Sequence, residues 1–215
     1  MDDVTVLPHD RILAFGDSLT EGAGGTRDWS TEPATGNGWL AQLTRLAQGP
    51  DRAIEFANRG VGGNKVGDLL DRVQAEVIEA EPTLVILWIG VNDVWHWRDG
   101  QGTSEDDYRN GLRSLVRRLH EDDLRVLLCT PSVIGEQLEG ANAQDAMLTT
   151  YVGISAEIAA DEGAALCDLH TAFRDELARV NADDAADGVL TTDGVHLSDA
   201  GSELVAATVA SALDL

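Results

Sequence analysis

Short runs of apolar residues alternate with stretches of helical periodicity along the whole chain, and this alternation limits the folds open to it. Runs of four to eight apolar residues have the length of buried strands. Five such runs occur, at residues 11–15, 53–57, 84–89, 125–129 and 165–169. Apolar residues recur at helical spacing in the intervals and near the end, over residues 66–77, 112–119, 147–158 and 204–212. This alternation predicts a parallel sheet covered by helices on both faces.

The chain has the size and uniformity of one domain. It contains 215 residues, of which 43% are hydrophobic, and neither an internal repeat nor a Pro- or Ser-rich linker divides it. We therefore expect a single domain over residues 1–215. In open α/β sheets, ligands bind at the carboxyl ends of the strands, where the strand order reverses. The residues that directly follow the predicted strands are thus the candidates for a functional site.

The charge of the chain excludes some classes of partner. There are 38 acidic and 15 basic side chains, a formal net charge of −23, and Lys65 is the single lysine. Nucleic acid and stable association with anionic membranes are therefore not expected. Self-repulsion opposes a compact state, and molar salt removes most of it by shortening the screening length to about 3 Å. The composition favours a high-salt environment, and because no signal peptide or membrane span is visible, we expect a cytoplasmic protein.

Three predicted strands run into residues suited to acyl transfer. The first ends in Gly-Asp-Ser-Leu, which places Ser18 at its carboxyl end. The second runs into residues 58–63, Asn-Arg-Gly-Val-Gly-Gly, whose glycines allow backbone N–H groups to approach a ligand closely. The third ends in Gly-Val-Asn-Asp, which contains Asn92. Taken singly, each of these has an ordinary explanation as a turn-forming residue or segment.

An acidic residue and a histidine near the C-terminus complete the set. Asp193 and His196 lie three residues apart in Asp-Gly-Val-His, before a final helix for which Ser198 is a suitable N-cap. A serine hydroxyl is a weak nucleophile unless a base removes its proton, and a carboxylate holds that base in the required tautomer. The serine, the glycine-rich turn, the asparagine and the Asp-x-x-His pair together indicate acyl transfer.

The four segments resemble the four motif blocks of the SGNH hydrolases, also called the GDSL family of esterases and lipases. Ser18 matches the first block, Gly63 the second, Asn92 the third, and Asp193 with His196 the last, in the same order. The resemblance extends from about residue 11 to residue 213 and includes the order of strands and helices. It implies a three-layer α/β/α sandwich around a flavodoxin-like five-stranded parallel sheet, an ester hydrolase activity and no cofactor.

The resemblance also implies a role for each matched residue. Ser18 is the nucleophile that forms the acyl-enzyme, His196 is its general base, and Asp193 orients the imidazole and stabilises the imidazolium. The backbone N–H groups of Ser18 and Gly63 and the side-chain amide of Asn92 form the oxyanion hole.

Several neighbouring residues have expected roles of their own. Asp17 and Asp93 lie next to matched positions, and we expect them to brace loops rather than to react. Core packing is the expectation for Trp88. Trp95 and Trp97 are equally consistent with packing and with stacking on a sugar ring or an acyl chain at the edge of a cleft.

We expect no metal site and no disulfide. Cys129 and Cys167 each lie in a short apolar run, which indicates buried free thiols. The acidic segment at residues 183–193 lacks the ligand spacing and the closing Glu of a calcium loop.

The sequence leaves alternative functions open. An acyltransferase would pass the same acyl group to a sugar hydroxyl, and a lysophospholipase or thioesterase would use a different pocket. A non-catalytic flavodoxin-like module would cradle a phosphate in the loop at residues 22–25, but this loop lacks a following Lys-Ser/Thr and does not open a helix. The favoured partners are small-molecule acyl esters, either short-chain esters or O-acetylated glycans. We expect residues 22–37 and those after Asn92 to shape the pocket.

Overall fold

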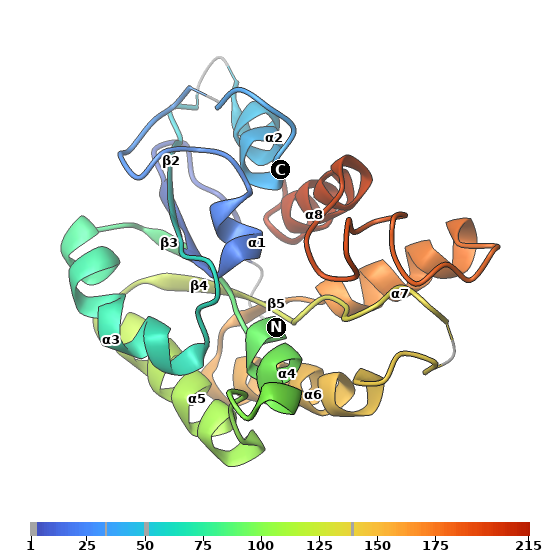
Figure 1. Ribbon diagram of the computed structural model, residues 1–215. Coiled ribbons are helices and arrows are strands. Elements are labelled where there is room, and N and C mark those ends of the chain that lie inside the picture. Colours follow the sequence, from blue (N-terminus) through green and yellow to red (C-terminus); the bar gives the residue numbers. More distant parts are fainter. Residues whose placement is uncertain (1–3, 33, 50–51, 139) are drawn as a thin grey trace.

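Five parallel strands form the centre of the protein, in the order β2-β1-β3-β4-β5 (Figure 1). The strands are β1 (Arg11–Gly16), β2 (Glu55–Gly60), β3 (Leu84–Trp88), β4 (Arg125–Cys129) and β5 (Ala165–Cys167). The structure is a computed structural model that describes residues 4–32, 34–49, 52–138 and 140–215. The strand order 2-1-3-4-5 is that of flavodoxin-like sheets, so the predicted sheet is confirmed.

Helices cover both faces of this sheet (Figure 1). One face carries α2 (Trp39–Ala47), α7 (Leu169–Val180) and α8 (Asp199–Ala212), with α8 packed against the other two. The other face carries α3 (Val66–Glu76), α5 (Glu105–Glu121) and α6 (Asp145–Glu162), with α5 packed against both neighbours. The short helices α1 (Ser18–Glu21) and α4 (Val91–Trp95) follow β1 and β3. The predicted α/β/α sandwich is therefore confirmed. No helix in the described ranges is long and apolar enough to cross a membrane.

The second strand differs from its prediction. It begins at Glu55 rather than at residue 53, and it continues to Gly60 through residues expected to form a turn. Asn58 explains the difference, because its side-chain amide donates to the carbonyls of Thr20 and Gly24, each at 2.7 Å. A buried asparagine whose hydrogen bonds are made inside the protein is compatible with a strand.

The end of the fifth strand and two of the helices also differ from the sequence-based prediction. The fifth strand stops at Cys167 because the Asp168 carboxylate caps α7 by accepting the N–H of Thr171 at 3.1 Å. Neither α7 nor α2 was predicted. The predicted cap of the last helix is confirmed, since the Ser198 hydroxyl accepts the N–H of Gly201 at 3.2 Å.

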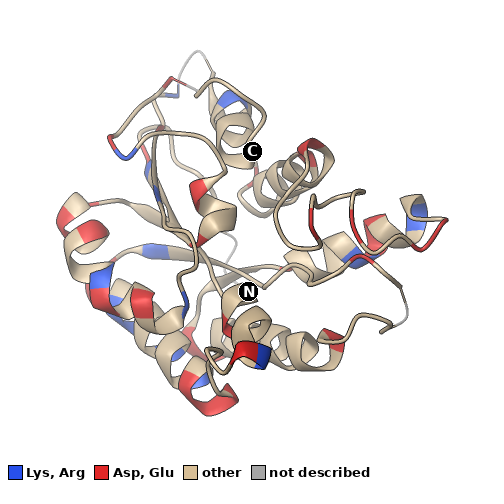
Figure 2. Ribbon diagram, viewed as in Figure 1, with Lys and Arg blue, Asp and Glu red and all other residues tan. Residues whose placement is uncertain are grey.

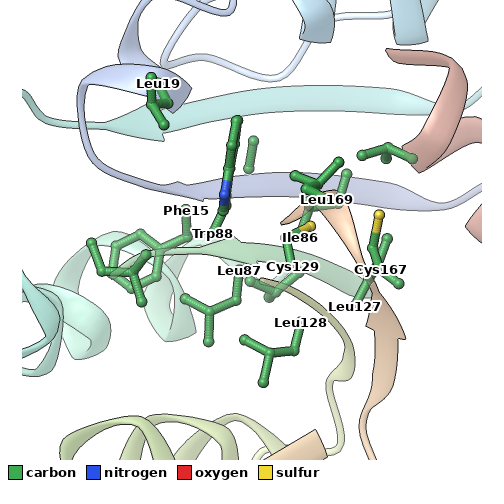
Figure 3. Packing of buried hydrophobic residues seen from close by; sticks show 14 of the residues in the cluster. Phe15, Leu19, Ile86, Leu87, Trp88, Leu127, Leu128, Cys129, Cys167 and Leu169 are labelled. Carbon is green, nitrogen blue, oxygen red and sulfur yellow. The ribbon is translucent and has the colours of Figure 1, made fainter. Parts of the chain in front are cut away.

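The core lies between the sheet and the two helical layers, and Figure 3 shows part of it. Trp88 is buried, donates its indole N–H to the Thr130 carbonyl at 3.0 Å and packs edge-on against Trp39, which confirms its expected packing role. Cys129 and Cys167 are neighbours in the register of β4 and β5. Both are free and buried, as predicted.

Acidic residues are spread along the chain, in helices and in loops, rather than gathered in one segment (Figure 2). Within the described residues, four acidic side chains are buried, namely Asp10, Asp17, Asp93 and Glu136. The remaining described carboxylates are partly or fully exposed. Their mutual repulsion is therefore open to screening by dissolved ions.

We expect the protein to become more stable as KCl rises from about 0.1 M to about 2 M, because the screening length shrinks from about 10 Å to a few Å and self-repulsion falls. Thermal unfolding followed by circular dichroism measures this. An unfolding midpoint that stays constant or falls over the series would contradict salt adaptation of the surface.

Candidate active site

A sharp turn at the end of β1 positions Ser18. It is the first residue of α1, and the buried Asp17 carboxylate caps this helix by accepting the N–H of Leu19 at 2.9 Å. The cap turns the chain directly after the strand. The Ser18 side chain therefore lies at the carboxyl edge of the sheet, where the sequence analysis expected ligands.

Ser18, His196 and Asp193 form one hydrogen-bonded chain. The Ser18 hydroxyl lies 3.2 Å from Nε2 of His196, across 178 residues of sequence. Nδ1 of the same ring lies 2.7 Å from Oδ2 of Asp193. The other carboxylate oxygen accepts the N–H groups of Val195 at 3.0 Å and His196 at 2.8 Å. This arrangement leaves Nε2 of the neutral ring facing the hydroxyl as an acceptor.

The surroundings of Asp193 keep its carboxyl group ionised. Partial burial raises its pKa, but the hydrogen bonds from the His196 ring and from the two backbone N–H groups outweigh burial and hold the pKa below the usual value. An ionised carboxylate fixes the proton on Nδ1 and stabilises a positive charge on the ring.

The second motif block lies next to Ser18, and the third contacts the turn that contains the second. A Cβ atom added at Gly62 would lie 3.9 Å from Cβ of Ser18, so the turn after β2 borders the serine. Gly63 has φ +76°, a left-handed conformation that glycine adopts without strain. Among the described residues, neither its N–H nor that of Ser18 has a hydrogen-bond acceptor.

Asn92, in α4, donates one amide N–H to the carbonyl of Asn64 at 3.1 Å. Its second amide N–H remains available, because an amide has two donors.

Arg72 joins the segments behind these donors and was missed by the sequence analysis. Its guanidinium donates to the carbonyl of Gly16 at 2.7 Å, the carbonyl of Arg59 at 2.8 Å and Oδ1 of Asn64 at 2.8 Å. It also lies over the Phe15 ring, 4.4 Å from the centroid. One side chain thus connects the ends of β1 and β2 with the residue that orients Asn92. The sequence carried no signal for this, since an arginine within a helix usually lies on the surface.

Asp17 and Asp93 both brace loops, as expected. Asp17 caps α1, and Asp93 accepts the N–H of Val66 at 3.2 Å, which holds the start of α3. Burial is the main reason that the pKa of Asp17 rises to about 7 and that of Asp93 to about 6. The charge of Asp93 also raises the pKa of Asp17, while the Leu19 N–H and the charge on His196 oppose the rise.

The aromatic residues after the third block differ in position. The Trp95 ring meets the His196 ring edge-on, with 5.7 Å between centroids, and packs partly on the core. Trp97 is 48% exposed. Trp95 therefore forms one wall around the histidine, and Trp97 lies further out on the surface.

A small cavity of about 120 Å³ adjoins the serine and the histidine. It is lined by Ser18, Leu19, Gly22, His196, Leu197 and Ser202. Within the described ranges, no three His, Cys, Asp or Glu side chains are grouped so as to hold a metal ion.

A serine, a histidine and an aspartate form one hydrogen-bonded chain at the carboxyl edge of a flavodoxin-like sheet, which is the arrangement of a serine hydrolase. The family model described as the GDSL-like Lipase/Acylhydrolase family matches residues 14–204. The chain belongs to this family, and it is a carboxylic ester hydrolase.

Several characterised relatives are similar over nearly the whole chain. An acetylxylan esterase of Geobacillus stearothermophilus is 32% identical over 208 residues, which cover 92% of this chain and 90% of that protein. The crystal structure of the acetyl xylan esterase AlAXEase has a TM-score of 0.86 and 32% identity, and the match covers 94% of this chain and 99% of that one. The structure of Axe2, an acetylxylan esterase from Geobacillus stearothermophilus, has a TM-score of 0.85 and 27% identity, with 100% and 97% covered. Three Axe2 structures are catalytic mutants in which a serine, a histidine or an aspartate is replaced by alanine.

We expect Asp17→Asn to flatten the dependence of stability on pH. The pKa of Asp17 is raised from 3.8 to about 7 in the folded protein. Between these values the folded state binds a proton that the unfolded state has lost, so stability falls as pH rises through this window. Asparagine has no proton to lose, and its oxygen still accepts the Leu19 N–H. Thermal unfolding at about pH 5 and about pH 8 measures the difference.

The exposed Asp71→Asn is the matched control and should keep the wild-type dependence on pH. An equal loss of stability between the two pH values in Asp17→Asn and in the wild type would show that Asp17 is ionised throughout.

Proposed function

We propose that the protein removes acetyl groups from O-acetylated carbohydrates, with Ser18 as the nucleophile and His196 as its base. The observation that carries this proposal is the hydrogen-bonded chain from Ser18 through His196 to Asp193, with contacts of 3.2 and 2.7 Å. It has the order and the lengths that activation of a serine hydroxyl requires.

The reaction proceeds through an acyl-enzyme. Oγ of Ser18 attacks the ester carbonyl carbon while Nε2 of His196 takes the hydroxyl proton, and Asp193 stabilises the resulting imidazolium. The tetrahedral intermediate collapses, the bond to the sugar oxygen breaks, and His196 returns its proton to that oxygen. Water then repeats the sequence on the acetyl-serine, which releases acetate and restores the free hydroxyl.

The negative charge on the tetrahedral intermediate requires donors that are already in place. The N–H groups of Ser18 and Gly63 and the free amide N–H of Asn92 fill this role. Two features support the assignment: neither backbone N–H has an acceptor among the described residues, and the Asn64 carbonyl fixes the orientation of the Asn92 amide. Donors held in advance stabilise the transition state without reorganisation.

The size of the cavity supports a short acyl group. A volume of about 120 Å³ beside Ser18 accommodates the few heavy atoms of an acetyl group. The acetylxylan esterases among the relatives support an acetylated xylo-oligosaccharide as the other part of the substrate. The exposed Trp97 offers a face on which a sugar ring stacks. The net charge of −23 supports neutral small molecules, rather than nucleic acid or a membrane, as partners.

A series of p-nitrophenyl esters from acetate to laurate, assayed in molar KCl, tests the proposal. We expect the highest kcat/KM for acetate and a fall of at least about tenfold beyond butyrate, because each further methylene lacks room in the cavity. Ser18→Ala should abolish turnover of every ester. Measuring the acetate released from acetylated xylo-oligosaccharide tests whether the enzyme acts on acetylated carbohydrate. Equal turnover by Ser18→Ala, or a rise toward laurate, would overturn the proposal.

Replacing the side-chain donor of the oxyanion hole should separate rate from binding. We expect Asn92→Ala to lower kcat for p-nitrophenyl acetate by about 100- to 1000-fold and to change KM little, since the lost hydrogen bond forms to the transition state. Steady-state kinetics measures both constants. Trp97→Ala is the comparison on the outer surface. We expect it to raise KM for the oligosaccharide and to leave kcat for p-nitrophenyl acetate nearly unchanged. A normal kcat in Asn92→Ala would remove this residue from the oxyanion hole.

A further inference from the structure

The loop that carries Asp193 and His196 is held in place by one fully buried carboxylate, that of Glu136. This side chain is 0% exposed. Oε2 accepts the N–H of Val189 at 2.8 Å, and Oε1 accepts the N–H of Leu190 at 2.7 Å together with the N–H and the hydroxyl of Thr191. A buried charge is costly unless donors surround it, and here three consecutive backbone N–H groups and a hydroxyl do so.

The anchorage continues from Thr191 to the catalytic segment. The Thr191 hydroxyl donates to Glu136 at 2.8 Å and accepts the N–H of Gly194 at 3.0 Å. The carbonyl of Gly194 accepts the N–H of Gly135 at 2.8 Å. Gly194, which lies between Asp193 and His196 in sequence, is thus bonded through its carbonyl to Gly135, next to Glu136, and through its N–H to the hydroxyl that donates to Glu136.

The two segments approach too closely for larger residues. Gly194 has φ +89°, and a Cβ atom added to it would lie 3.3 Å from the Cα atom of Gly135. The loop also closes on itself, because the N–H of Thr192 donates to the carbonyl of His196 at 2.7 Å. A shift of Glu136 would therefore move the backbone before Asp193 and at Gly194, between the two catalytic residues.

Two hydrogen bonds of its backbone hold Glu136 itself in place. Its backbone carbonyl accepts the Asn181 amide at 3.0 Å, and its backbone N–H donates to the carbonyl of Ala186 at 2.9 Å. In Figure 1 the segment after β4 that contains Glu136 runs beside α7, whose C-terminal end leads into the catalytic loop. The carboxylate is thus held rigidly between β4 and the loop that it supports.

We propose that Glu136 is a positioning residue for catalysis, whose carboxylate holds the loop at residues 189–196 so that Asp193 and His196 face Ser18. This inference rests on the proposed catalytic roles of those three residues. Glu136 touches no reacting atom, and its effect on the rate passes through the geometry of the His196 ring. Misplacement of a catalytic group by about 1 Å costs up to about 100-fold in rate.

The test compares Glu136→Gln with Asp10→Asn. Glutamine keeps the shape but turns one acceptor oxygen into an NH₂ group that faces backbone donors. Asp10 is a matched control, because it is a buried carboxylate at the opposite edge of the sheet, where it accepts the N–H of Leu7 and the hydroxyl of Thr83. Both variants should unfold at a lower temperature. We expect only Glu136→Gln to lower kcat for p-nitrophenyl acetate, by about 10- to 100-fold, with KM changed less than about twofold.

A readout without substrate separates this inference from the proposed function. The proton between Nδ1 of His196 and Asp193 should give a low-field ¹H NMR resonance in the wild type and in Asp10→Asn, and a shifted or broadened one in Glu136→Gln. Ser18→Ala with full activity would overturn the proposed function and leave this resonance to decide the role of Glu136.

Thr191→Val supplies a second variant if Glu136→Gln does not fold. It removes only the hydroxyl that links Glu136 to Gly194 and keeps the three backbone hydrogen bonds. We expect the same changes in kcat and in the resonance, at smaller size. Wild-type kcat and a wild-type resonance in the folded variants, with only the unfolding temperature lowered, would overturn the inference and make Glu136 a purely structural residue.

Discussion

All five strands run in the same direction, so every strand delivers its following residues to one edge of the sheet, and the site depends on this constraint. The strand order places β1 between β2 and β3. Ser18 follows β1, Gly63 follows β2 and Asn92 follows β3. Ser18 therefore lies between the two segments that we propose to supply donors, and each of the three is fixed by a short connection to a buried strand.

The histidine and aspartate come from elsewhere in the chain and need a different support. No strand leads into residues 189–196, so the backbone there is held by polar contacts instead of a ladder. Glu136 holds this loop as Arg72 holds the ends of β1 and β2. In both cases one ionic side chain makes several hydrogen bonds to backbone groups, at the strand ends for Arg72 and in the loop for Glu136. Such bonds allow irregular segments to be buried at acceptable cost.

The contrast between these two kinds of support explains how far the sequence predicts the structure. Buried strands have local signals, so the sheet was predicted, and the motif residues Ser18, Asn92, Asp193 and His196 could be proposed as site residues from the sequence. Strand β2 was misplaced because Asn58 appears as a turn residue unless its distant partners Thr20 and Gly24 are known. Arg72 and Glu136 were missed for the same reason. Each acts through partners far away in sequence, and nothing in its own neighbourhood distinguishes it from a surface charge.

The buried acids behind the nucleophile bear on the oxyanion that the site must stabilise. The net charge of −23 disfavours a further negative charge on the protein. Two ionised carboxylates next to Ser18 and Asn92 in sequence would disfavour it further. Burial raises the pKa of Asp17 to about 7 and that of Asp93 to about 6, so a share of each is neutral near neutral pH. Both groups still accept the backbone N–H that braces their loop. The same desolvation that costs stability thus lowers the negative charge behind the proposed oxyanion hole. Asp193 is more exposed and surrounded by donors, so it stays ionised beside the ring on which we propose that a positive charge forms.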